Sequence, residues 1–166
     1  YILPEEGKKL ILGNQYMIYT TLKPLKNKEG DIIGVPHRVN GVVEIVKLEK
    51  THAVGKVVKS YWEFKEGNKI APYKKKSPDI AYAPTPKGIS GDIIMGAFDD
   101  VAFAQNQIVF LDKGKNQNVK MGQKYNIYRD LVVPPSAASS ETTTSPIDLG
   151  KLLILDAGED ASSAII

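Results

Sequence analysis

"GNQYMIY" at residues 13–19 and "GQKYNIY" at residues 122–128 repeat one pattern within a single chain. Each begins with glycine and continues with tyrosine, isoleucine and tyrosine at matching positions, 109 residues apart. Alternating apolar positions rich in aromatic and β-branched residues are typical of a half-buried β-strand, and a leading glycine permits a sharp bend into it. A repeat at this domain-sized interval predicts two related β units.

The residues around the two phrases extend the match, with one gap placed on each side. Alternate side chains along the matched stretches are expected to point inward, and we predict an all-β fold without helices. The architecture expected is two tandem small units, each resembling a β-barrel or sandwich and produced by internal duplication. The matched pairs are Leu3 with Leu111, Tyr16 with Tyr125, Ile18 with Ile127, Gly41 with Gly150, Val43 with Leu152, Ile45 with Ile154, Ala53 with Ala161 and Val57 with Ile165.

The predicted units are residues 1–73 and 89–166, joined by a linker over residues 74–88 in which prolines disfavour helix and central strand. The second unit is expected to be truncated at its C-terminus, because "KSYWEFKEGNKIAPY" at residues 59–73 has no counterpart in the second copy. The start at Tyr1 suggests a piece of a longer precursor.

Glycines mark the expected turns. "DKGK" at residues 112–115 predicts a tight reversal with Gly114 at positive φ, and "EGN" at residues 66–68 predicts another. "PPSAASSETTTSP" at residues 134–146 is typical of a surface loop.

Composition limits the functions available to the chain. Its 166 residues are 42% hydrophobic and 25% charged, as in an ordinary globular protein. The absence of cysteine excludes disulfides, thiol nucleophiles and Cys-ligated zinc. The apolar runs are too short to cross a bilayer, so no membrane span is predicted. The charge of +3 divides into +4, +3 and −4 over the first unit, the linker and the second unit.

The sequence offers no convincing catalytic or metal-binding constellation. His37 and His52 are the two histidines, and neither has a counterpart in the second copy, so they are interpreted as surface or loop residues. Asp99 and Asp100 are adjacent and would point to opposite faces of a strand, which favours a solvated turn. "DKGKNQN" at residues 112–118 carries lysines where calcium needs oxygen ligands. We therefore predict no enzyme activity, no cofactor and no metal.

Two stretches are candidates for binding. Three lysines at residues 74–76, near Tyr73 and Tyr82, suit nucleic acid phosphates, but an acidic second unit would repel a polyanion, so no nucleic acid partner is predicted. Tyr61 and Trp62, in the aromatic cluster "KSYWEFKEG" at residues 59–67, are the candidate binding residues. On a strand one of them would be buried and the other exposed, and an exposed tryptophan can stack on a sugar or anchor a protein. Core packing is the competing interpretation.

Two long stretches carry a family resemblance. Residues 34–73 and 108–129 resemble the β-rich region that follows the lysin-motif (LysM) peptidoglycan-binding domain in certain exported bacterial envelope proteins. A strand, an Asp-x-Gly turn and a glycine-initiated strand are also similar to small β-barrel modules of cell-shape and flagellar-assembly proteins. The resemblance implies export to the periplasm or cell envelope and a non-catalytic accessory role.

The resemblance also implies the partners. The chain lacks the Gly-Asp-Thr-Leu phrase of the glycan-binding domain, so peptidoglycan is expected to be bound by a neighbouring domain. The predicted function is a spacer or protein-docking platform within a larger peptidoglycan-associated protein, with another envelope protein as partner. The alternative is a carbohydrate-binding module that uses Trp62, and an enzyme of unrecognised type ranks third.

Overall fold

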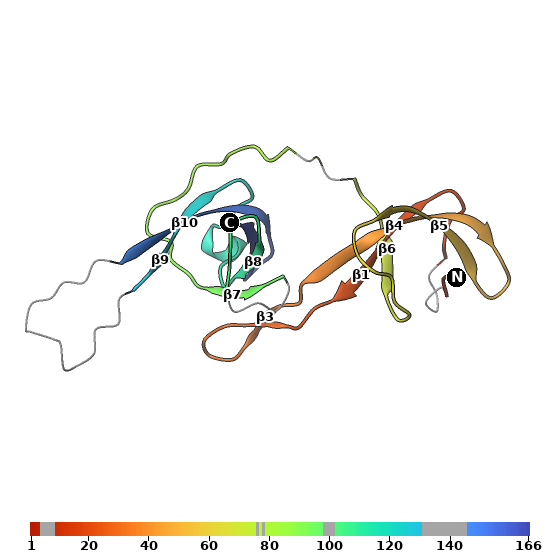
Figure 1. Cartoon of the computed structure of the whole chain (residues 1–166), viewed down its shortest axis with the longest axis horizontal. Coiled ribbons are helices and arrows are strands. Elements are labelled where there is room, and N and C mark those ends of the chain that lie inside the picture. Colours follow the sequence, from red (N-terminus) through yellow and green to blue (C-terminus); the bar gives the residue numbers. More distant parts are fainter. Residues whose placement is uncertain (4–8, 76, 78, 98–101, 131–145) are drawn as a thin grey trace, which may run out of the picture. The chain divides into compact units, whose positions relative to one another are not determined.

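The regular elements of the chain are β-strands, apart from one short 3-10 turn among the residues described (Figure 1). This confirms the predicted all-β fold. The computed structural model describes residues 1–3, 9–75, 77, 79–97, 102–130 and 146–166. In the described part of the chain, no helix is long and apolar enough to cross a membrane.

The chain divides into two compact units, and one segment of the first half of the sequence belongs to the second unit. Tyr1–Lys23 and Val35–Ser77 form the first unit, whereas Pro24–Gly34 and Pro78–Ile166 form the second. Residues 24–34 were expected within the first unit, and instead they pack with the second. They form a small hairpin whose Leu25 side chain is buried, so apolar burial explains its place in the second unit.

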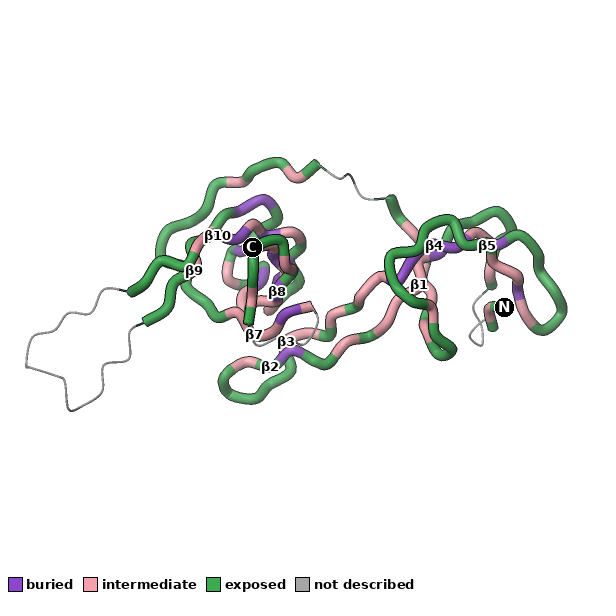
Figure 2. Tube along the Cα trace, viewed as in Figure 1, coloured by how far each residue is buried: buried purple, intermediate pink, exposed green. Residues whose placement is uncertain are grey.

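The first unit is an antiparallel sheet with the strand order β5-β4-β1-β6. Its apolar face is built from alternate residues of these strands, as the sequence predicts for Tyr16, Ile18, Val43 and Ile45. Figure 2 shows a buried stretch along β4. The strands are β1 (Gln15–Thr21), β4 (His37–Leu48), β5 (Ala53–Ser60) and β6 (Lys69–Pro72).

The second unit is a sheet with the order β7-β8-β11-β10-β9. Its core contains the predicted Leu152 and Ile154, with Tyr125 and Ile127 packed against them. The strands are β7 (Ile93–Gly96), β8 (Ile108–Leu111), β9 (Lys124–Arg129), β10 (Ile147–Ala157) and β11 (Ser162–Ile165); the hairpin is β2 (Leu25–Lys26) with β3 (Ile32–Gly34), and η1 (Lys115–Gln117) is the 3-10 turn.

The two sheets share one pairing register. Tyr16 lies opposite Val43 in the first unit, and Tyr125 lies opposite Leu152 in the second, each residue displaced by 109. Both ladders are then interrupted at matching places, because one extra residue bulges from β4 at Asn40 and from β10 at Leu149.

Equivalent residues of the two units stay 109 positions apart even in the regions where the sequence comparison placed gaps. Leu48 lies opposite Ala53, and Ala157 lies opposite Ser162, so Ser162 rather than Ala161 is equivalent to Ala53. Upstream, Ile2 lies opposite Ala53 as Leu111 lies opposite Ser162, so Ile2 rather than Leu3 is equivalent to Leu111. The inward orientation predicted for Val57 is also wrong, because 49% of its surface is exposed.

Glycine has two different roles in the turns. Gly13 and Gly122 take φ values of 79° and 87°, and their N–H groups donate to the equivalent carbonyls of Ile45 and Ile154 at 2.8 and 2.9 Å. These residues form the predicted corner before each strand, and Gly67 confirms the predicted turn at residues 66–68. Gly114, however, is extended at φ −134°, and its lack of a side chain admits the Glu159 carbonyl instead.

Part of the predicted linker packs on the second unit. The Ala83 N–H donates to the Gly122 carbonyl at 3.0 Å. Thr85 Oγ1 donates to the Lys124 carbonyl at 2.9 Å and lies 3.1 Å from the Lys124 N–H, from which it accepts. These contacts attach residues 83–85 to the start of β9.

Candidate functional site

The two candidate binding residues lie in the connection that follows β5. The strand ends at Ser60, so the alternation expected of Tyr61 and Trp62 does not apply to them. Both are exposed, at 55% and 44% of their surface, and the prediction that one of them is buried is wrong. Phe64 supplies the packing contact instead, because its ring lies directly over Gly41. We call residues 60–64 the aromatic turn.

A buried asparagine holds the aromatic turn in place. Asn40, the bulged residue of β4, is only 2% exposed. Its carbonyl accepts hydrogen bonds from the backbone N–H groups of Tyr61 and Trp62 at 2.8 and 2.9 Å. Its side-chain Nδ2 donates to the Glu63 carbonyl at 2.7 Å, and its Oδ1 accepts from Thr20 Oγ1 at 3.0 Å. The bulge leaves Asn40 unpaired in the ladder, so its carbonyl and side chain are free to bind the aromatic turn. We call this set of hydrogen bonds the clamp.

Arg38 completes the surface. It lies two residues before Asn40 on β4, and its guanidinium carbon is 5.1 Å from the centre of the Trp62 ring. A guanidinium over an indole is a cation–π contact that also restricts the ring's rotation. The aromatic turn and Arg38 therefore present tryptophan, tyrosine and arginine from a backbone already fixed by hydrogen bonds.

Asn40→Ala is expected to lower the free energy of unfolding of the first unit by about 2 kcal/mol, because two side-chain hydrogen bonds of a buried residue are lost, one to the Glu63 carbonyl and one from Thr20 Oγ1. Trp62 is the single tryptophan, so its fluorescence reports on the turn. We expect stronger quenching by acrylamide in this variant. Asn27→Ala, in an exposed turn of the second unit, is the control. Unchanged quenching and stability in Asn40→Ala would show that Asn40 is not the clamp.

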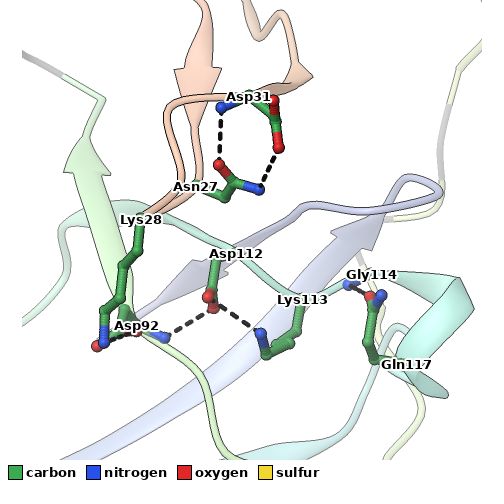
Figure 3. A network of polar contacts seen from close by, with 8 residues as sticks. All are labelled: Asn27, Lys28, Asp31, Asp92, Asp112, Lys113, Gly114 and Gln117. Atoms are coloured by element: carbon green, nitrogen blue, oxygen red, sulfur yellow. Dashed lines mark hydrogen bonds and ion pairs between the residues drawn. The ribbon is translucent and has the colours of Figure 1, made fainter.

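A second polar cluster lies in the second unit (Figure 3). Lys28, in the hairpin turn, reaches Asp92 at 2.8 Å, and the Asp92 N–H donates to Asp112 Oδ1 at 2.7 Å. Lys113 Nζ lies 3.1 Å from the other oxygen of Asp112. The hydrogen bond to Asp92 and its negative charge raise the pKa of Lys28 above its ordinary value. Each carboxylate is occupied by a lysine, so this arrangement suits attachment of the hairpin better than acid–base chemistry.

The remaining candidates are dispersed. The His37 ring packs against Tyr19 at 4.8 Å, and the His52 ring packs edge-on against Tyr1 at 5.0 Å. Among the residues that the structure describes, no three histidine or acidic side chains are close enough together to hold a metal ion. Asp99 and Asp100 lie outside the described residues, as do Lys76 and nearly all of the loop over residues 134–146.

Comparisons with protein-family models, with curated proteins and with solved structures found no match. The site must therefore be interpreted from its own chemistry. The structure brings Tyr61 and Trp62 together with Arg38, a residue that the sequence did not single out. One feature of the sequence could have indicated the role of Asn40: it is a polar residue directly before the apolar run at residues 41–43.

Proposed function

We propose that the chain is a non-catalytic module of the bacterial cell envelope that docks a partner protein through the aromatic turn. It would act as a docking platform or spacer within a larger, exported, peptidoglycan-associated protein of the LysM type. The sequence resemblance of residues 34–73 and 108–129 supports this setting. Contact with peptidoglycan would be made by a neighbouring domain.

We also infer that the two units arose by internal duplication. The shared register supports this, because Tyr16 and Val43 pair as Tyr125 and Leu152 do. Matching bulges at Asn40 and Leu149 are the stronger support, because a bulge is a specific irregularity that is retained in related sheets. The aromatic turn lies in the first unit, so the docking role proposed here is assigned to that unit.

The observation that carries the docking proposal is the exposed Tyr61–Trp62 pair beside Arg38 on a clamped backbone. Tryptophan, tyrosine and arginine are the residues most enriched among those that dominate binding energy at protein interfaces. A surface already fixed by the hydrogen bonds of Asn40 loses little conformational entropy when a partner binds. These properties favour a protein partner for the aromatic turn.

Glycan binding by Trp62 is the second candidate. An exposed indole can stack on a sugar ring, and Tyr61 adds a second ring next to it. Arg38 lies over the indole, however, and a sugar would have to stack on the opposite face or displace the guanidinium. This contact makes the glycan proposal the weaker of the two.

Trp62→Ala is expected to weaken binding to the protein partner by about tenfold or more, as for a central interface residue. The immobilised chain would be exposed separately to solubilised envelope proteins and to purified peptidoglycan, and retained proteins would be identified by mass spectrometry. Tyr82→Ala is the matched control, because Tyr82 is also an exposed ring beneath a cation, with Lys124 Nζ at 3.8 Å. Peptidoglycan binding that depends on Trp62 would instead establish the glycan-binding alternative.

A further inference from the structure

The positive charge of Arg38 has no acidic partner in the described part of the chain. Glu63 is the one acidic residue of the aromatic turn, and it pairs with Lys65, whose Nζ lies 3.2 Å from Oε2. The Arg38 guanidinium instead contacts the neutral indole of Trp62. A cation–π contact holds a cation in place without neutralising it, so the charge remains available to an anion.

The Arg38 side chain is buried at Nε and accessible beyond it. Nε has no hydrogen-bond partner, whereas the two Nη groups are not among the buried atoms of the described residues. The side chain as a whole is partly exposed. A buried N–H group without a partner is destabilising, and an anion bound at the guanidinium offsets part of that cost through its charge. The Nη groups form a planar fork that matches a carboxylate, which binds through two parallel hydrogen bonds.

The surface around Arg38 lies between strands that are already in place. Ser60 ends β5, the aromatic turn follows, and β6 then pairs along β1. At the N-terminal side, Ile2 pairs with Ala53, which is the other end of β5. The exposure of the aromatic turn is therefore not that of a sheet edge that lacks its next strand.

The charge of the first unit favours an acidic partner. Tyr1–Lys23 and Val35–Ser77 contain 13 lysine and arginine residues against six aspartate and glutamate residues, a formal charge of +7. Such a surface attracts anionic groups and repels cationic ones before contact is made. The second unit contains nine basic residues against 13 acidic ones, a charge of −4, so a second copy of this chain is the competing source of carboxylates.

We propose that the aromatic turn recognises a carboxylate, supplied by an aspartate or glutamate side chain of the partner protein. The carboxylate binds the Nη groups of Arg38, and an apolar residue next to it in the partner packs on Tyr61 and Trp62. Arginine also binds phosphate, but the carboxylate is the anion of an unmodified protein. This inference rests on the docking function proposed above and adds the chemical class of the residue that is recognised.

Selection from a library of random displayed peptides tests the inference and the docking function separately. The immobilised chain would be used as the wild type, as Arg38→Gln and as Trp62→Ala. We expect the wild type to select peptides with aspartate or glutamate at one fixed position beside an apolar residue. Arg38→Gln should select peptides without that acidic position, and Trp62→Ala should select none of either kind.

A selected peptide, capped at both ends, is then compared with a twin in which the acidic residue is replaced by its amide. Titration followed by Trp62 fluorescence is expected to show about tenfold weaker binding of the twin to the wild type, and equal binding of both peptides to Arg38→Gln. Arg38→Lys should keep part of the preference, because the charge remains but the fork is lost. Lys124→Gln is the control: it removes the other cation held over an exposed ring and should leave the tenfold preference intact.

The outcomes separate the two claims. Trp62-dependent peptides with no acidic position, or an acidic preference that persists in Arg38→Gln, would overturn the carboxylate inference and leave the docking function standing. Failure to select any Trp62-dependent peptide would overturn both. Self-association of the chain that Arg38→Gln abolishes would assign the carboxylate to a second copy and would overturn the inference. If denaturant unfolding shows that Arg38→Gln does not fold, a preference in Arg38→Lys as strong as that of the wild type overturns it instead.

Discussion

Replacing Ile154 with alanine is expected to lower the free energy of unfolding of the second unit by about 2–5 kcal/mol. The side chain is fully buried in the core formed with Val109, Val119, Leu152 and Ala164. Truncation removes apolar contacts and leaves a cavity that a sheet joined by backbone hydrogen bonds on both sides cannot readily close.

The shared register makes this a paired experiment. Ile45 is the equivalent residue of the first unit and is also fully buried, so Ile45→Ala is expected to have an effect of similar size there. Denaturant unfolding followed by Trp62 fluorescence reports on the first unit, and amide exchange reports on both. Ile147→Ala, at an exposed position of β10, serves as the control. Losses below about 1 kcal/mol for both core variants would contradict the assigned cores.

Gly122→Ala is expected to destabilise the chain considerably more than Gly13→Ala, although the two glycines occupy equivalent corners. Both have positive φ, which costs about 1–2 kcal/mol for alanine. A Cβ on Gly13 meets no atom within 4 Å, whereas a Cβ on Gly122 would overlap the Ala81 carbonyl oxygen. Moving residues 81–85 to relieve this overlap would add about 1–3 kcal/mol.

Unfolding of the two single variants by denaturant measures this difference. The Gly122→Ala variant should also show faster amide exchange at Ala83, because its hydrogen bond to the Gly122 carbonyl depends on the same close approach. Equal destabilisation by the two substitutions would show that residues 81–85 do not rest on β9 as described.

Much of the fold was predictable because β-strands impose a period of two on their sequences. The alternation in residues 13–19 and 122–128 identified Tyr16, Ile18, Tyr125 and Ile127 as inward residues, and the structure confirms it. Residue identity favours a gap that matches Ala53 with Ala161, but the strand register matches Ala53 with Ser162. In the ladder, both residues are buried and small, and their position in the register matters more than their polarity.

Other features depend on contacts between segments far apart in the sequence. Nothing local to residues 24–34 indicates that they pack with the second unit, because that depends on burying Leu25 and on Lys28 reaching Asp92. The extended Gly114 is likewise explained by the distant Glu159 carbonyl. The aromatic turn was recognised by composition, but its exposure depends on where β5 ends and on the clamp formed by Asn40.

The central claim, that the aromatic turn docks a protein, is tested most directly by photo-crosslinking in living bacteria. The photoreactive amino acid p-benzoylphenylalanine would replace Tyr61 in the protein, and Tyr82 in a parallel experiment. We predict a discrete protein adduct from position 61 that Trp62→Ala abolishes, and no such adduct from position 82. An absence of protein adducts at position 61, or the same adducts from both positions, would contradict the account.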